Sequence, residues 1–162
     1  MRIWDSELGG FAREKRENAV NVLARNFAFF AGKFLWDSTQ ELRKNIGDNN
    51  VFEQSIFEYS NDKLFDLSFI KGVLIHINPE KLPIVYENLY ASSKKFILIA
   101  EYYNPSPVTI PYRWESDKLF KRDFAGEMLD KYPDLKLINY GFVYHRDNSF
   151  KQDDVTWFLL EK

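Results

Sequence analysis

The chain has 162 residues, a single-domain length, and its 45% apolar and 28% charged residues exclude intrinsic disorder and fibrous repeats. Its 22 basic and 24 acidic residues give a formal charge of -2, which argues against a general nucleic-acid binder because such a protein needs a basic surface. It has no cysteine, so disulfides, thiolate metal sites and a cysteine nucleophile are excluded. We find no signal-peptide pattern and no apolar run of membrane-spanning length, and we expect a cytoplasmic protein without membrane association.

We expect one domain over residues 1–162, with a helical part over residues 1–50 and a sheet-forming part over residues 51–162. Within 13–35, apolar residues recur at alternating steps of three and four, which predicts a helix with one buried face. These residues are Val20, Leu23, Phe27, Phe30 and Phe34. A second, shorter helix should follow, because Ser38 and Glu41 have the spacing of a capping box and Gly47 supplies a stop.

The middle of the chain predicts a strand, a helix and a second strand in that order. Residues 51–56 form a short, partly apolar segment, and 69–75 is an apolar run typical of a strand buried on both faces. Residues 82–90 have helical spacing, and 96–100 is a second buried strand. This order within some forty residues predicts a parallel pair with a right-handed crossover, and therefore an α/β fold.

The last third of the chain predicts a polar loop, a helix and an antiparallel hairpin. The loop covers 101–115 and begins where a buried strand ends, which is where α/β folds bind ligands. The helix carries Phe120, Phe124, Met128, Leu129 and Tyr132. Residues 135–144 and 155–160 then predict two strands of a hairpin at the edge of the sheet.

Two histidines are candidates for acid–base chemistry, and two alone do not make a strong zinc site, so no metal site is expected. His76 is expected at the end of the central strand, where it either faces a ligand or is a satisfied structural histidine. His145 shares one loop with Arg146 and Asp147, so that an acid, a base and a histidine lie together.

Two further clusters could contact a substrate. Glu101, Tyr102, Tyr103 and Asn104 directly follow a strand, where they could orient a polyhydroxylated molecule or simply cap the strand end. The second cluster is basic, and it suits either a phosphate or carboxylate group or a solvated helix face. Its members are Tyr112, Arg113, Lys118, Lys121 and Arg122.

Five segments carry a resemblance to a known family. They are 71–80 (KGVLIHINPE), 99–105 (IAEYYNP), 117–127 (DKLFKRDFAGE), 140–147 (YGFVYHRD) and 152–158 (QDDVTWF). Together they resemble the pseudaminic acid biosynthesis-associated methylases, S-adenosylmethionine-dependent methyltransferases encoded alongside bacterial nonulosonate sugar pathways. The likeness is very close from about 41 to 162 and looser from 3 to 35.

The resemblance implies a truncated Rossmann-like class I methyltransferase fold, with parallel strands and a C-terminal antiparallel hairpin. It implies S-adenosylmethionine as cofactor and a sugar or sugar-nucleotide as substrate. Gln54, Ser55 and Ile56 would abut the adenine, and Lys71 and Gly72 would lie near the methionine end. Candidate bases are His76, Glu101 and His145. Candidate substrate-binding residues are Tyr102, Tyr103, Asn104, Tyr112, Arg113, Lys121, Arg122 and Arg146.

The chain departs from this family in one interval. Only 36–40 stands where the family has its first strand, a glycine-rich turn, a helix and a second strand ending in an acidic residue. Those features make the main cofactor contacts, and their loss also leaves an unpaired sheet edge through which we expect a homo-oligomer. Two hypotheses follow. The chain is a reduced methyltransferase acting on a nonulosonate or related glycan precursor, or a non-catalytic descendant that serves as a sugar-binding or partner subunit.

Overall fold

The structure is a computed structural model that describes residues 21–22, 43–44, 47–52, 55–59, 64–112, 115–149 and 151–162. Of the helix predicted over 13–35, only two residues are among these. They form strand β1 (Asn21–Val22), which pairs in parallel with β2 (Val51–Phe52). The helix prediction is therefore wrong at these two residues, where a β-branched valine suits strand pairing. The rest of that helix lies outside the described residues.

The stop predicted for the second helix is confirmed. Arg43 and Lys44 are helical, and the Gly47 N–H donates to the Arg43 carbonyl at 2.8 Å. Gly47 has a φ of 88°, a left-handed conformation that glycine adopts without a steric cost. A short 3-10 helix, Asp48–Asn50, follows.

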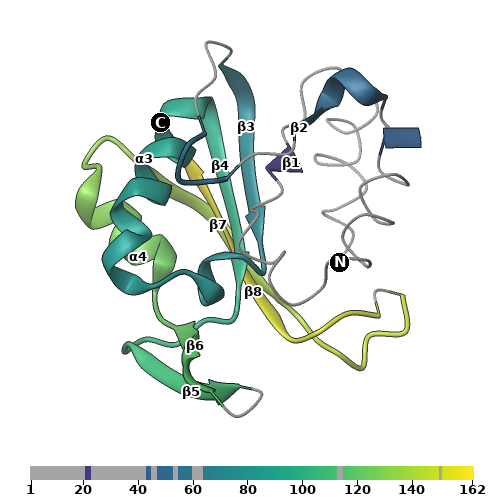
Figure 1. The fold of residues 1–162 in the computed structure, drawn as a ribbon, viewed down its shortest axis with the longest axis vertical. Coiled ribbons are helices and arrows are strands. Elements are labelled where there is room, and N and C mark those ends of the chain that lie inside the picture. The colour runs from purple at the N-terminus through teal and green to yellow at the C-terminus, as the bar shows by residue number, and fades with distance from the viewer. Residues whose placement is uncertain are drawn as a thin grey trace.

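The main sheet has four strands in the order β3-β4-β8-β7 (Figure 1). Strand β3 (Phe65–Lys71), helix α3 (Leu82–Ser92) and strand β4 (Ser93–Glu101) form the predicted unit, and β3 pairs in parallel with β4. Strand β8 (Val155–Glu161) lies antiparallel to both β4 and β7 (Lys136–Val143). The predicted parallel pair and C-terminal hairpin are both confirmed, with β7 at the edge.

The central strand ends earlier than predicted. Strand β3 stops at Lys71, and Gly72 then turns the chain with a φ of 63°. Leu74–His76 forms a 3-10 helix, so His76 lies beyond the strand and not at its end. The apolar run misled the prediction because Leu74 and Ile75 are buried in a helical turn, and periodicity does not separate short buried turns from buried strands.

The segment expected as a loop contains strands. Strand β5 (Val108–Tyr112) and strand β6 (Glu115–Lys121) form a separate antiparallel hairpin. Phe120 therefore lies in a strand, and the predicted helix begins only at α4 (Phe124–Lys131). Asp123 sets that beginning, because its carboxylate accepts the Gly126 N–H at 2.8 Å.

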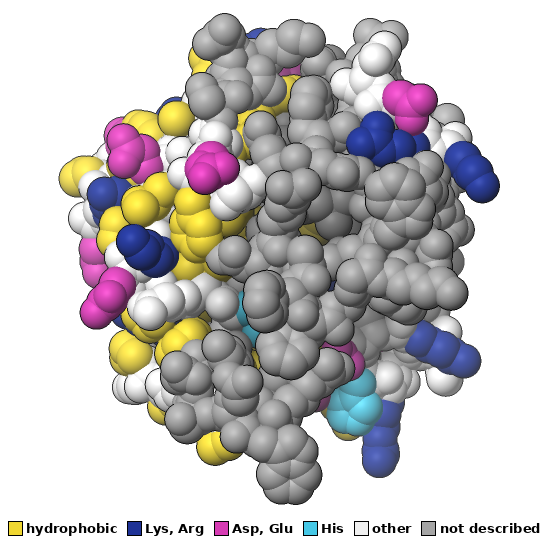
Figure 2. Space-filling model, in the orientation of Figure 1, with side chains coloured by type: hydrophobic (Ala, Val, Ile, Leu, Met, Phe, Trp, Pro, Cys, Tyr) yellow, Lys and Arg dark blue, Asp and Glu magenta, His cyan; other side chains and the backbone are white. Residues whose placement is uncertain are grey.

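One hydrophobic core joins both helices to the sheet. It includes the fully buried Val85 of α3, Met128 of α4, Ile97 of β4 and Leu160 of β8. Figure 1 shows α3 and α4 on the same side of the molecule. In the same view, both acidic and basic side chains lie on the described surface on this side (Figure 2). Within the described ranges, no helix is long and apolar enough to cross a membrane.

Candidate functional site

A cleft of about 510 Å³ lies at the carboxyl ends of β3 and β4. Its lining residues are Lys71, Gly72, Ile75, His76, Ala100, Glu101, Tyr102, Leu119, Gln152, Asp153 and Val155. Its volume falls in the range of about 300–1,000 Å³ that small-molecule sites occupy. Parallel strands bring their carboxyl ends to one edge, so the sheet itself gathers these residues.

Glu101, the last residue of β4, is buried and only 3% exposed. Its Oε1 atom accepts the backbone N–H groups of Val73 at 2.9 Å and Leu74 at 3.0 Å. Its Oε2 atom is also buried and has no hydrogen-bond partner. Burial raises the pKa of Glu101 to about 7, although the backbone N–H groups of the turn favour the charged form and oppose this rise.

The turn at Gly72 forms part of the lining of the cleft. The Gly72 N–H donates to the Ala100 carbonyl at 3.1 Å, which ties the turn to β4. No atom lies within 4 Å of the position that a Cβ would take, so the turn needs glycine for its backbone conformation and leaves open space beside it. The same turn brings His76 into the cleft, where the histidine is half-buried.

The loop between β7 and β8 forms one wall of the cleft through two side-chain contacts. The Lys71 ammonium donates to the Gln152 side-chain oxygen, and the Tyr102 hydroxyl donates to Asp153 at 2.7 Å. The Lys121 ammonium lies 5.2 Å from the centre of the Tyr102 ring. Gln152 and Asp153 were not among the predicted site residues, although both lie in the resembling segment 152–158.

His145 and Arg146 do not line this cleft. The His145 backbone N–H donates to Asp154 Oδ1 at 2.8 Å, and its Nδ1 atom lies 2.9 Å from the same oxygen. These two bonds hold the pKa of Asp154 below its usual range. The pair closes the β7–β8 loop, and Arg146 is exposed on it.

Three further predicted substrate contacts, Tyr103, Asn104 and Arg122, do not line the cleft. Tyr103 packs its ring 5.6 Å from that of Phe158 and forms an isolated backbone bridge with Arg122. Asn104 donates to the Ser106 carbonyl at 2.5 Å, and Arg122 donates to Glu127 at 2.5 Å. The side chain of Tyr112 and the whole of Arg113 lie outside the described residues, as does Gln54.

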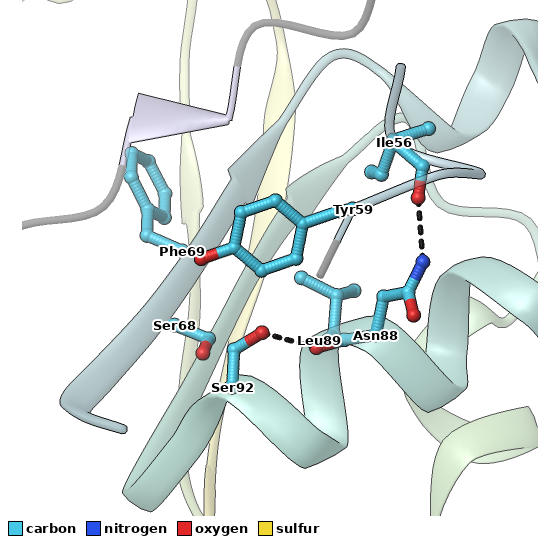
Figure 3. A pocket seen from close by; sticks show the side chains of 7 residues that line it. All are labelled: Ile56, Tyr59, Ser68, Phe69, Asn88, Leu89 and Ser92. Atoms are coloured by element: carbon cyan, nitrogen blue, oxygen red, sulfur yellow. Dashed lines mark hydrogen bonds between the residues drawn. The ribbon is translucent and has the colours of Figure 1, made fainter. Parts of the chain in front are cut away.

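A second, much smaller cavity of about 10 Å³ lies between β3 and α3 (Figure 3). Its lining residues are Ile56, Tyr59, Ser68, Phe69, Asn88, Leu89 and Ser92. Asn88 donates to the Ile56 carbonyl at 2.6 Å, and a space of this size holds at most one water molecule. Ile56 thus lines this cavity and not the cleft, while the Ser55 hydroxyl accepts the Phe57 N–H at 3.2 Å.

Solved structures that resemble this chain are S-adenosylmethionine-dependent methyltransferases. One is the 1,6-didemethyltoxoflavin-N1-methyltransferase of Burkholderia thailandensis, solved with 1,6-didemethyltoxoflavin and S-adenosylhomocysteine. It is 12% identical, with a TM-score of 0.60 over 76% of this chain and 55% of that chain. A second is the magnesium protoporphyrin IX methyltransferase of Synechocystis PCC 6803, solved with S-adenosylmethionine. It is 11% identical, with a TM-score of 0.52 over 80% of this chain and 55% of that chain.

A third is an S-adenosylmethionine-dependent methyltransferase of Clostridium acetobutylicum, 10% identical, with a TM-score of 0.53 over 78% of this chain and 70% of that chain. The fold is that of these methyltransferases, so the truncated Rossmann-like class I fold is confirmed. The chain spans about half the length of the first two. No protein-family model and no curated protein matches the sequence. Among the residues that the structure describes, no group of three acidic or histidine side chains could hold a metal ion.

Proposed function

We propose that this chain binds S-adenosylmethionine in the cleft at the ends of β3 and β4 and methylates a small polar acceptor. The observation that carries the proposal is the buried Glu101 carboxylate beside the Gly72 turn, at the ligand-binding edge of a methyltransferase fold. Two proteins of this fold were solved with S-adenosylhomocysteine or S-adenosylmethionine, which supports the choice of cofactor.

The residues of the cleft fit such a cofactor. Its volume of about 510 Å³ is that of a small-molecule site, and the surface beside Gly72 is open. Glu101 Oε2 has no partner within the protein, and an anionic oxygen of this kind favours a cationic ligand nearby. Lys71 and Gly72 would hold the methionine end. S-adenosylmethionine, when bound, supplies an electrophilic methyl group on a positively charged sulfur.

Two residues of the cleft are candidate bases for the acceptor. A general base works best when its pKa lies near the working pH, which favours Glu101 because its pKa is about 7. His76 lines the same cleft and is the second candidate. His145 does not line it, so we propose no proton transfer for that residue. The largest contribution to rate would come from holding the acceptor in line with the methyl group.

For the acceptor, we propose a sugar or sugar-nucleotide of a nonulosonate or related glycan pathway. The support is the sequence resemblance together with the wall of the cleft, where Lys71, Tyr102, Gln152 and Asp153 offer both donors and acceptors. Side chains of these types suit a molecule with several hydroxyl groups.

Calorimetric titration with S-adenosylhomocysteine tests cofactor binding. We expect a micromolar Kd, which corresponds to a binding free energy of about -8 kcal/mol. Glu101→Gln should weaken binding about tenfold or more, because the substitution removes a buried carboxylate of the cleft that would face the ammonium group of this ligand. Glu80→Gln is the matched control, since Glu80 is exposed and lies outside the cleft, and its Kd should equal that of the unchanged chain.

The same titration separates the proposal from its alternative. Only 36–40 occupies the interval where a glycine-rich cofactor turn would stand, and this observation favours a non-catalytic chain that serves as a sugar-binding or partner subunit. The absence of heat up to millimolar ligand would overturn cofactor binding and favour that alternative. Binding followed by methyl transfer from labelled cofactor to a sugar-nucleotide would support both parts of the proposal.

A further inference from the structure

Strand β7 exposes an unusual amount of apolar surface. Half of the large exposed hydrophobic side chains among the described residues lie on this strand or directly after it. They are Leu137, Ile138, Tyr140, Phe142 and Tyr144, and the exposed fraction reaches 67% for Tyr140 and 60% for Phe142. Exposed apolar patches of this kind mark interaction sites more often than chance.

The register of the sheet explains how this patch arises. Ile99 of β4 lies opposite Phe158 of β8, and Phe158 lies opposite Tyr140 of β7. Ile99 is buried in the core beneath the helices, whereas Tyr140, two strands further across, is largely exposed. The Phe158 and Tyr140 rings are stacked with their centres 6.4 Å apart. The apolar layer of the core therefore continues across β7 beyond the cover of the helices.

The outer edge of β7 is also open to pairing. Within the described sheet β7 pairs only with β8, so one row of its backbone N–H and C=O groups faces outward. Proteins usually protect such an edge with charges, proline or a bulge. Residues 137–144 contain no charged residue and no proline, and the one irregularity in register lies between Leu137 and Asn139, before the regular pairs of 139–143.

We propose that β7 pairs in an antiparallel manner with β7 of a second copy of this chain. The two four-stranded sheets would then form one continuous sheet about a two-fold axis, and the Tyr140 and Phe142 rings of both copies would pack across it. A second copy is favoured as the partner because antiparallel self-pairing places the uncharged segment 137–144 against itself. No like charges then meet within it.

The exposed side chains supply more than half of the area that such a dimer needs. Five large side chains, each roughly half-exposed, offer on the order of 500 Å² in each copy, and the paired backbone adds to this. A standard interface buries about 800 Å² for each partner. The sequence also predicts an oligomer, through the sheet edge that the missing strands would leave unpaired.

The first test is the oligomeric state, measured by sedimentation equilibrium at roughly 100 μM, where a dimer with a micromolar Kd is almost fully formed. We expect a dimer whose Kd rises at least tenfold in Tyr140→Lys and in Phe142→Lys. Ile84→Lys is the matched control, because Ile84 is 40% exposed on α3, and it should leave the dimer intact. Circular dichroism establishes that each variant is folded.

The second test uses the absence of cysteine from the chain. Mild oxidation should join two copies by a disulfide when a single cysteine lies close to the two-fold axis. We expect this covalent dimer for those of Asn139→Cys, Tyr140→Cys and Phe142→Cys that lie nearest the axis, and we expect none for Ile84→Cys. A monomer at roughly 100 μM would overturn the proposal. So would a dimer that dissociates with Phe69→Lys on β3 but tolerates both lysines on β7. Neither result depends on cofactor binding.

Discussion

Glu101 is the only Asp, Glu, Lys, Arg or His among the buried residues that the structure describes. An isolated carboxylate in such a place destabilises the fold unless it is neutral or well hydrogen-bonded. Two backbone N–H groups satisfy Oε1, and nothing in the protein satisfies Oε2. The buried carboxyl group of Glu101 is therefore unfavourable for the stability of the fold. Such a group is expected of a functional residue and not of one that only packs in the core.

The pKa of Glu101 predicts how stability depends on pH. The folded chain holds this proton up to about pH 7, whereas the unfolded chain releases it near 4.5. The contribution of Glu101 to the free energy of unfolding is therefore full below about pH 4.5 and is lost as the pH rises through about 7, by up to about 3 kcal/mol. Urea unfolding at a series of pH values, in the unchanged chain and in Glu101→Gln, measures this difference.

The variant removes the titrating group, so its free energy of unfolding should fall less steeply between pH 4.5 and 7 than that of the unchanged chain. Other carboxylates affect both proteins equally and cancel in the comparison. Parallel curves for the two proteins would show that Glu101 titrates near its ordinary value.

Tyr86 joins α3 to α4 through a polar contact within a largely apolar region. Its hydroxyl donates to Glu127 Oε2 at 2.7 Å, and Arg122 donates to the other oxygen of the same carboxylate. Burial and this hydrogen bond raise the pKa of Tyr86 above its usual range.

Tyr86→Phe should lower the free energy of unfolding by about 1–3 kcal/mol, because a hydrogen bond to a charged group is lost in a partly buried place. Tyr90→Phe is the matched control on the same helix. Its hydroxyl donates to Asp134 at an exposed position, where water replaces the bond, and its effect should stay within about 0.5 kcal/mol. Equal losses in the two variants would contradict the structural role of the Tyr86 bond.

At the scale of elements, the β7–β8 hairpin depends on the absence of a side chain at Gly141. Gly141 lies opposite Trp157, and a Cβ at Gly141 would lie 2.7 Å from the indole ring. That ring is rigid, so a clash of this kind must shift either the ring or the strand.

Gly141→Ala should therefore cost about 1–3 kcal/mol in the free energy of unfolding. In a Trp157→Leu background the same change should cost clearly less, and this non-additivity identifies the indole as the cause. Chemical denaturation of the four proteins in the cycle measures it. An unchanged cost in the leucine background would attribute the effect to the backbone of the strand instead.

At the scale of the whole molecule, the sequence predicts the parts of the fold that have a clear periodicity. The run 96–100, the helical spacing of 82–90 and the strand 155–160 were recognisable, because their apolar residues face one core. Strand β7 was recognisable from its apolar and aromatic residues, although most of them are exposed. The β5–β6 hairpin was missed because Pro107 and Pro111 are typical of loops, and its first strand is mostly exposed.

The sequence predicted only those residues of the site that lie at the end of a strand or shortly after it. Lys71, Gly72, His76, Glu101 and Tyr102 come together because parallel strands share one ligand-binding edge. Gln152 and Asp153 could not be found in this way, because they reach the cleft through the antiparallel register of β8. That register pairs Glu101 with Thr156, and no spacing along the chain encodes it.

The strand order has a consequence for the chain as it folds. Strand β8 follows β7 in the sequence but lies between β4 and β7 in the sheet. Until β8 is in place, β7 has no strand of the main sheet beside it, and its aromatic residues lack the sheet that they extend. During that interval in folding β4 has an open edge as well, so two unpaired strands are available to other incompletely folded chains.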